Sequence, residues 1–162
     1  MIESERCILI TLNEADYYDV KKLFMDKEVM RYLGGTADED KFRTKFSGYL
    51  AESDSLYWVI RKKEANQFIG LVSLGLHHNG VNKEVSYMLL PIWWGYGYAT
   101  EVLKEVINYA FKDLKLLDVI AETQIANKAS RKLLEKVGMC LVHRLKRFSA
   151  EQGIYSIKNT FK

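Results

Sequence analysis

Proline and cysteine are scarce in this chain, and it has no long apolar run and no strong net charge. Its 162 residues include one proline, two cysteines and ten glycines, and 48% are hydrophobic, so we expect neither low complexity nor disorder. Two isolated cysteines, Cys7 and Cys140, give neither a disulfide framework nor a zinc site. We therefore expect no metal, and a reducing, cytoplasmic compartment. No apolar run reaches the roughly 18 residues of a membrane span, and the charged N-terminus is unlike a signal peptide.

The charge is small but unevenly distributed. A net charge of +3 is too weak to indicate nucleic-acid binding. From Ala126 onward nine lysines and arginines stand against Glu135 and Glu151, whereas residues 1–54 lean acidic. The basic C-terminal part favours an anionic ligand, and the acidic N-terminal part favours a cationic amine. Charged side chains on solvated faces explain the same pattern without any ligand.

The hydrophobic pattern predicts one mixed α/β domain over residues 1–162. We expect strands at residues 7–12, 56–61, 68–77, 81–90, 116–123, 140–146 and 153–159, with Cys140 buried in its strand. We expect helices from Asn13 or Glu14 to Met25, at 27–33, at 38–52, from about Ala99 to Ala110, and at 128–137. Helices separate the strands only in the second half, so part of the sheet should be parallel, and the order excludes a doubly wound dinucleotide fold.

The segment LLPIWWGYGYATEVL, residues 89–103, joins a strand to a helix through two tryptophans and two glycines. Glycine accepts torsions that other residues resist and lets backbone approach a ligand. The first turn of the following helix has unpaired N–H groups and partial positive charge. The segment therefore predicts a backbone site for phosphate or pyrophosphate, or else a tight turn whose glycines only relieve sterics. It is neither a Walker loop nor a Rossmann fingerprint.

Two motifs in this half of the chain resemble those of the GNAT N-acetyltransferases. YMLLPIWWGYGYATEVLKEVINYAF resembles the family's motif A, and IANKASRKLLEKVGM, residues 125–139, resembles the next motif of the ribosomal-protein alanine and serine N-acetyltransferases. VMRYLGG, residues 29–35, fits the N-terminal helical region of that branch. The resemblance runs through nearly the whole chain. It implies a GNAT fold, with a mixed, mostly antiparallel sheet splayed in the middle and helices on both faces.

The resemblance also implies which residues bind acetyl-CoA. The amides of the turn should hold its pyrophosphate, which involves Trp94, Gly95, Tyr96, Gly97, Tyr98, Ala99 and Thr100. Met88, Leu89 and Leu90 should lie along the pantetheine arm, and an N–H of Leu89 or Leu90 should face the thioester oxygen. Asn127 caps a helix in its own right and should also bond the arm, together with Ser130. Basic residues on the same helix, Lys128, Arg131 and Lys132, are candidates for the adenosine phosphates or simply solvated.

The chemistry needs a group that removes a proton from the amine, whose pKa is near 10.4 when unperturbed. Glu84 is the candidate general base, or else only a strand-edge carboxylate; His77 and His78 are weaker candidates that we expect to be exposed. The family often protonates the leaving sulfur with a tyrosine, but Leu134 occupies that position here. Ser130, another hydroxyl, water, or unassisted departure remain open.

The predicted function is acetyl-CoA-dependent N-acetylation of a primary amine, either a protein N-terminus or a small molecule, by direct attack on the thioester. The N-terminal helices, the Gly34–Asp38 loop and the last hairpin should form the acceptor pocket, with Tyr32, Tyr57 and Trp58 as candidate lining or as core. The alternatives are a non-catalytic acyl-CoA-binding module and an interaction domain. We expect a monomer or homodimer without nucleic-acid or membrane partners.

Overall fold

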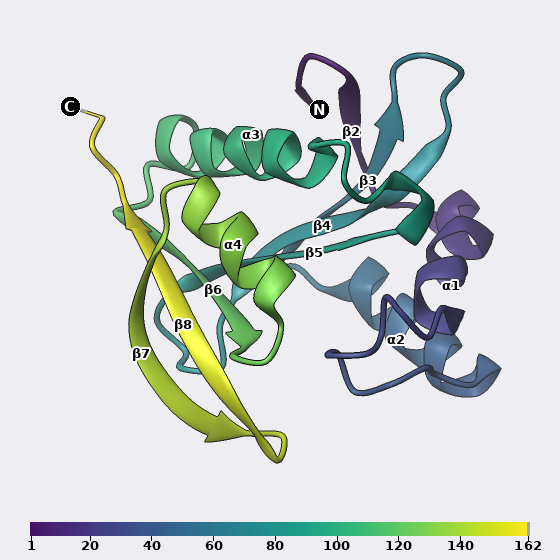
Figure 1. Cartoon of the computed structure of the whole chain (residues 1–162). Helices are drawn as coiled ribbons and strands as arrows, with labels where there is room; N and C mark the ends of the chain where they lie inside the picture. The colour runs from purple at the N-terminus through teal and green to yellow at the C-terminus, as the bar shows by residue number, and fades with distance from the viewer. Residues whose placement is uncertain (162) are drawn as a thin grey trace.

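The protein folds around a single eight-stranded sheet with helices on both faces (Figure 1). We describe residues 1–161 of a computed structural model. The strands are β1 (Ile2–Glu3), β2 (Cys7–Thr11), β3 (Leu56–Lys62), β4 (Phe68–Leu76), β5 (Lys83–Leu89), β6 (Asp118–Gln124), β7 (Cys140–Arg147) and β8 (Ala150–Lys158). The helices are α1 (Tyr17–Met25), α2 (Glu39–Ala51), α3 (Tyr98–Lys112) and α4 (Lys128–Lys136), with short 3-10 turns η1 (Glu14–Asp16) and η2 (Pro91–Trp93).

The sheet order is β1-β2-β3-β4-β5-β6-β8-β7, and every pair is antiparallel except β5 and β6. β5 pairs with β4 from Lys83 to Leu89, but with β6 only through Glu84 and Ile120. The two parallel strands therefore separate beyond Glu84. The predicted mixed, mostly antiparallel sheet is confirmed, and the gap between β5 and β6 opens a path through its middle.

Two apolar clusters hold the layers together. Val102, Leu103 and Val106 of α3 pack with Leu134 of α4 against one face of the sheet. Phe24 of α1 packs with the α2 phenylalanines against the other face. Alternate residues of β3 serve the two clusters, as the two-residue period of a strand requires. Each face is thus built from an amphipathic helix pair that the sequence pattern had located.

The segment predicted as a helix at 27–33 is instead a series of turns, so this prediction is wrong. The Asp26 carboxylate accepts the N–H groups of Glu28 and Val29, and the segment ends at Gly34, whose φ is 93°. A seven-residue piece forms too few helical bonds to offset the cost of nucleation. Turn bonds and the burial of Val29 and Met30 hold it in place.

Cys140 is exposed, not buried as the sequence suggested. It begins β7, the edge strand of the sheet, most of whose residues are exposed. The neighbouring Leu141 packs against the core cluster, so the two-residue period of the strand turns Cys140 to the opposite, exposed face. Within residues 1–161, none of the helices has the length and apolar character needed to cross a bilayer.

Candidate active site

The glycine-rich turn lies directly at the N-terminus of α3. Gly95 and Gly97 adopt φ values of 83° and 82°, in the left-handed region that favours glycine. Gly97 caps α3 without a side-chain hydrogen bond. The N–H groups of the first helical turn, from Tyr98 to Thr100, therefore have no partner within the helix. The glycines make the turn, and the same turn leaves amides unpaired, so its geometry is compatible with both interpretations of the segment.

A groove of about 1140 Å³ runs from this turn past β5 and α4. Its walls include most of the residues expected to bind acetyl-CoA: Met88, Leu89, Trp94, Gly95, Gly97, Tyr98, Ala99, Thr100, Asn127 and Ser130. Glu84 lines it as well. Tyr96 and Leu90 are not among the lining residues; Tyr96 is exposed, and Leu90 packs against the α1–α2 cluster.

The end of β5 exposes one amide to the groove. The N–H of Leu90 donates to the carbonyl of Ile69 at 2.9 Å, so it is not free to face a thioester. Because successive amides of a strand point to opposite sides, the N–H of Leu89 points away from β4, toward the gap beside β6. The carbonyl of Leu89 accepts a hydrogen bond from the indole Nε1 of Trp94 at 2.8 Å. The structure thus leaves Leu89, of the two candidates, as the amide that faces the gap.

The N-terminus of α4 forms the opposite wall. The Asn127 side chain accepts the N–H of Ser130 at 3.1 Å, as expected of a helix cap. The hydroxyls of Ser130 and Tyr87, which both line the groove, share a hydrogen bond of 2.5 Å. Burial raises the pKa of Tyr87 to about 12. Tyr87 was not among the residues predicted from the sequence, because its hydrogen-bond partner Ser130 is 43 positions away.

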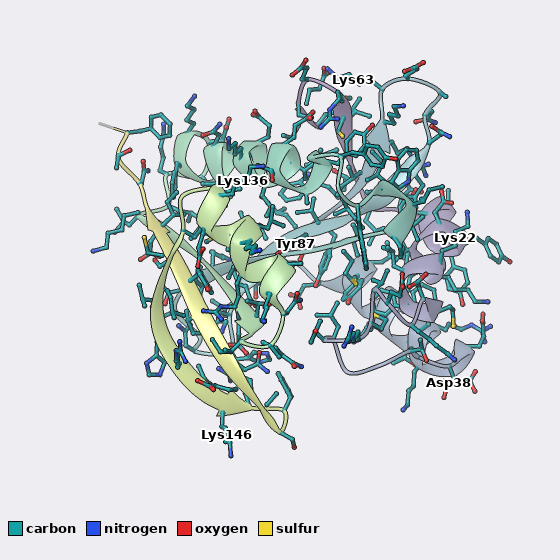
Figure 2. All side chains as sticks on the ribbon, in the orientation of Figure 1. Lys22, Asp38, Lys63, Tyr87, Lys136 and Lys146 are labelled. Carbon is teal, nitrogen blue, oxygen red and sulfur yellow. The ribbon has the colours of Figure 1, made fainter. Side chains whose placement is uncertain are left out.

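Lysines extend the same wall along α4. Lys128 and Lys132, two of the candidates for the adenosine phosphates, line the groove, and so does Lys136, one turn further along. Lys136 is labelled on α4 in Figure 2. The four-residue spacing puts the three side chains on one helix face. Arg131 does not belong to this row, because its guanidinium donates to the Tyr155 hydroxyl and the Ile125 carbonyl.

Glu84 lies where β5 and β6 separate, next to a charged cluster. Its carboxylate accepts the backbone N–H of Glu122 at 3.1 Å. Burial raises the pKa of Glu84, with the charge of Glu122 adding to the effect and His77 and Arg147 opposing it. A carboxylate with a raised pKa in a groove has the property that a general base needs near neutral pH.

His77 is buried, which corrects the expectation that both histidines are exposed; His78 is exposed and lines the groove. The ring of His77 accepts the N–H of Asn79 at Nδ1, so Nε2 carries the proton and donates to Glu122 at 2.8 Å. Arg147 donates to the other oxygen of Glu122. This pairing holds the charge of Glu122 in place and leaves Glu84 as the carboxylate available to a ligand.

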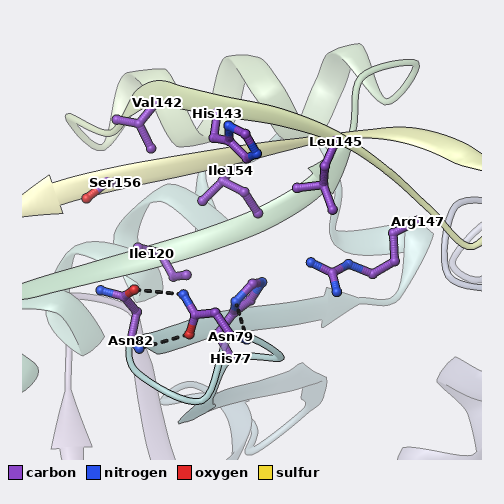
Figure 3. A pocket seen from close by; sticks show the side chains of 10 residues that line it. All are labelled: His77, Asn79, Asn82, Ile120, Val142, His143, Leu145, Arg147, Ile154 and Ser156. Atoms are coloured by element: carbon purple, nitrogen blue, oxygen red, sulfur yellow. Dashed lines mark hydrogen bonds between the residues drawn. The ribbon is translucent and has the colours of Figure 1, made fainter.

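A second, smaller cavity of about 430 Å³ lies beside His77 (Figure 3). Asn79 and Asn82 close one side of it through a hydrogen bond of 2.8 Å, and β7 and β8 supply the other side. Its members His77 and Arg147 already donate hydrogen bonds to Glu122. Among residues 1–161, no group of three or more His, Cys, Asp or Glu side chains could hold a metal ion.

The end of the groove near Glu84, where we expect the acceptor, is lined from two sides. Tyr32 and Gly34 come from the turns after α1, and Gln152 and Phe148 from the last hairpin. The Gln124 side chain donates to the Tyr32 carbonyl at 3.2 Å and ties the two sides together. The groove thus brings together the Gly34 loop and the last hairpin, two of the segments from which the sequence predicts an acceptor pocket.

Tyr57 and Trp58, by contrast, are core residues. Tyr57 stacks on Tyr49, and Trp58 packs edge-on against Tyr109. Neither lines the groove. Of the three aromatic candidates, only Tyr32 reaches it, because strand alternation turns the other two toward helices α2 and α3.

The family model of the acetyltransferase (GNAT) domain matches residues 6–140. The chain belongs to this family. It is 27% identical over 169 residues to YoaA, an uncharacterized N-acetyltransferase of Bacillus subtilis, and the match covers 97% of this chain and 96% of that protein. A shorter match, 41% over 56 residues, is to the FsC-acetyl coenzyme A-N(2)-transacetylase of Aspergillus fumigatus and covers 35% of this chain and 24% of that protein.

Solved GNAT structures share the fold. An acetyltransferase from Bacillus anthracis superposes with a TM-score of 0.86 at 22% identity over 98% of both chains. A spermidine N-acetyltransferase from Vibrio cholerae, in complex with CoA and spermine, superposes with a TM-score of 0.83 at 18% identity over 96% of both chains. With the GNAT domain and its named relatives, the chain is an acyltransferase that uses acetyl-CoA.

Proposed function

We propose that the protein transfers the acetyl group of acetyl-CoA to a primary amine by direct attack of the amine on the thioester. One observation carries the proposal. A single groove connects the amide-rich turn before α3 with Glu84, through the gap between β5 and β6. The acyl donor and the amine therefore approach this gap from its two ends.

The donor half of the groove suits CoA. The amides at the start of α3 fit the pyrophosphate, since a helix N-terminus combines free N–H groups with partial positive charge. Leu89 supplies an N–H for the thioester oxygen, where negative charge develops during attack. Asn127, Ser130 and Met88 flank the arm between these two points.

Glu84 serves as the general base on the acceptor side. A cationic amine entering the groove meets a buried carboxylate whose pKa is raised by that burial, and transfer of a proton to it generates the nucleophile. The carbon–nitrogen bond then forms as the carbon–sulfur bond breaks, and the electron pair leaves with the sulfur. The nitrogen releases its second proton to water as the amide forms, and the CoA thiolate takes up a proton from solvent. The proton on Glu84 returns to solvent after the amide departs.

The acceptor is a protein N-terminus or a small-molecule amine. Resemblance to the ribosomal-protein alanine and serine N-acetyltransferases supports the first, and the fold of a spermidine N-acetyltransferase supports a polyamine as one form of the second. We further propose a cytoplasmic monomer or homodimer acting as a single domain, in keeping with two cysteines that are not bonded to each other. Light scattering with size exclusion measures the assembly.

The test begins with binding. Acetyl-CoA and CoA should raise the melting temperature and ATP should not, because a ligand that binds only the folded state stabilises it by about 2.7 kcal/mol at a hundredfold excess over its Kd. Release of the CoA thiol is then measured with peptides that begin with alanine or serine, with spermidine, and with amino sugars.

Glu84→Gln separates an enzyme from a binding module that has lost turnover. Removal of a general base lowers kcat about 100-fold or more, whereas Glu64→Gln, at a glutamate that is 86% exposed, should leave it unchanged. CoA binding without thiol release for any amine would favour the non-catalytic module. Absence of CoA binding would leave the turn without its ligand and refute the proposal.

A further inference from the structure

Two glutamates lie together where β5 and β6 separate. Glu84 of β5 pairs with Ile120 of β6, and its carboxylate accepts the backbone N–H of Glu122 at 3.1 Å. Both glutamates line the groove, and the side chain of Glu122 is only 8% exposed. Two carboxylates in one buried place repel each other, so the charge of one makes the other hold its proton more tightly.

Only Glu122 has side-chain partners that offset its charge. His77 donates from Nε2 to one oxygen at 2.8 Å, and Arg147 donates from Nε to the other oxygen at 3.0 Å. The ring of His77 donates as a neutral imidazole, because its Nδ1 accepts the N–H of Asn79. A guanidinium keeps its charge at every pH of interest. Arg147 is therefore the positive charge that balances Glu122.

The β7–β8 hairpin fixes the position of Arg147. Arg147 ends β7 and pairs with Ala150, and the two residues between them, Phe148 and Ser149, have φ values of 55° and 59°. Two consecutive positive φ values make a tight turn whose twist matches that of the strands. The Gln152 side chain also donates to the Arg147 carbonyl at 3.1 Å. Figure 3 shows the Arg147 side chain extending from this end of β7 into the small cavity.

A second ion pair of the same hairpin differs from this one in burial. Arg144 donates to Glu151 at 3.2 Å, and their side chains are 53% and 50% exposed. The side chains of Arg147 and Glu122 are 27% and 8% exposed. Water screens charges at the surface, whereas charges beside a buried carboxylate act on it through a medium of low dielectric constant. We therefore expect the buried pair to influence Glu84 and the exposed pair to have no such effect.

We propose that Arg147 and Glu122 are positioning residues that set how readily Glu84 gives up and accepts a proton. The charge of Glu122 alone would keep Glu84 protonated. Arg147 cancels that charge, so Glu84 can lose its proton and then accept one from the amine. Neither Arg147 nor Glu122 gains or loses a proton in this step. The inference rests on the proposed acetyltransferase function and deepens it.

The direction of the Glu84 pKa agrees with this balance. Burial raises the pKa, and Glu122 adds to the rise, whereas Arg147 opposes it, as does His77 when its ring is charged. Further charged or titratable side chains stand on the elements around Glu84, namely Lys83, Asp118, His78, Glu28, Arg31, Lys45 and the lysines of α4. All of these are present in every variant compared below, so they do not account for differences between the variants.

The first measurement needs neither CoA nor an acceptor. Carbon-13 NMR of glutamate-labelled protein follows the Glu84 carboxyl from about pH 4, near the ordinary glutamate pKa, to about pH 9. The signal is identified by its loss in Glu84→Gln. Arg147→Met should strengthen proton binding by Glu84 about tenfold or more, because an opposite charge is lost. Glu122→Gln should weaken it by a similar factor, because a like charge is lost, and the double variant should lie near wild type.

The opposite directions distinguish this role from a structural one. If Arg147 and Glu122 only held the cluster together, loss of either would admit water to Glu84, and both variants would weaken its proton binding. Arg147→Lys keeps the charge and should restore the wild-type titration. If Arg147→Met does not fold, Arg147→Gln, which keeps an N–H donor without the charge, should give the same strengthening.

The exposed pair of the hairpin supplies the matched controls. Arg144→Met and Glu151→Gln remove the same charges from the same hairpin, and they should leave the titration of Glu84 unchanged because water screens this pair. Melting temperatures show that each variant is folded.

The second measurement follows turnover once thiol release has identified an acceptor. The acid limb of kcat/KM against pH reports the base of the free enzyme. It should move to higher pH in Arg147→Met, which lowers kcat/KM on that limb about tenfold, and to lower pH in Glu122→Gln. Titration of the amine itself is the same in every variant.

The outcomes separate the inference from the proposed function. Shifts of Arg147→Met and Glu122→Gln in the same direction, or no shift in either, overturn the inference and leave the acetyltransferase proposal standing. Opposite shifts in the NMR titration with an unmoved acid limb also overturn it, because the balance then has no part in proton transfer. Absence of CoA binding overturns the proposed function and the inference with it.

Discussion

Gly70 offers a sharp test of how the sheet positions the site. It pairs with Leu89 at the end of β5, and a Cβ placed on it would lie 2.1 Å from the Met88 carbonyl oxygen and 2.9 Å from the Leu89 Cα. β4 is irregular at this point, since Ile60 pairs with Gly70 but Arg61 pairs with Phe68. Close approach of two strands beside a site is the setting in which a strand needs glycine.

Gly70→Ala forces β5 to move. Carbon and oxygen rarely approach closer than about 3.3 Å, so the two strands must separate by about 1 Å. Overpacking of this kind costs about 1–3 kcal/mol, and for a chain of 162 residues each kcal/mol lowers the melting temperature by about 2–4 °C. A displacement of about 1 Å at the reacting groups lowers kcat/KM about 100-fold, because Leu89 carries the amide proposed to face the thioester.

Differential scanning calorimetry and thiol release measure the two effects. Gly48→Ala is the control, since Gly48 is exposed within α2 and a Cβ there meets nothing within 4 Å. It should stabilise the protein by about 0.5–1 kcal/mol and leave activity unchanged. A Gly70→Ala protein as stable and active as wild type would refute the argument that this contact sets the position of β5.

Three further variants test separate parts of the groove. Because the pKa of Glu84 is raised, the folded protein holds this proton more tightly than the unfolded chain does, and the free energy of unfolding falls as pH rises from the unfolded to the folded pKa. At pH 7 the Glu84→Gln protein should therefore be more stable than wild type. Denaturant titration should show this difference in the free energy of unfolding vanish near pH 4. Trp94 is 47% exposed, and its indole donates to the Leu89 carbonyl. CoA should change tryptophan fluorescence in wild type and in Trp58→Phe, and should change it less in Trp94→Phe, where Trp93 still lines the groove. Replacing Lys132 and Lys136 by alanine should raise Kd for CoA about fivefold at low salt and much less at high salt; equal losses at both would show that these lysines do not act through charge.

The sequence alone determined much of this protein. Apolar periodicity located α3, α4 and nearly every strand, because each element buries one face and must repeat with its own period. The turn at Gly95 and Gly97 could be predicted because only glycine adopts positive φ values without a steric cost. Asn127 could be predicted as a helix cap because its side chain bonds a residue only three positions away, Ser130.

Three predictions were wrong: the helix at 27–33, the burial of Cys140 and the exposure of His77. Residues 27–33 form turns instead of the expected helix, because the Asp26 carboxylate accepts the N–H groups of Glu28 and Val29. Cys140 is exposed because it lies on β7, the edge strand of the sheet. His77 is buried, and its ring hydrogen-bonds the side chain of Glu122, which is 45 positions away in the sequence.

The tertiary structure decided the rest, since long-range pairing leaves no periodic trace in a sequence. Only the fold separates β5 from β6 after Glu84 and turns the Leu89 amide into the gap. Only the fold brings Tyr87 of β5 to Ser130 of α4, and gives Glu84 the burial that raises its pKa. Chemistry that depends on a low-dielectric setting and on groups from different elements is fixed by packing, and packing exists only once the chain has folded.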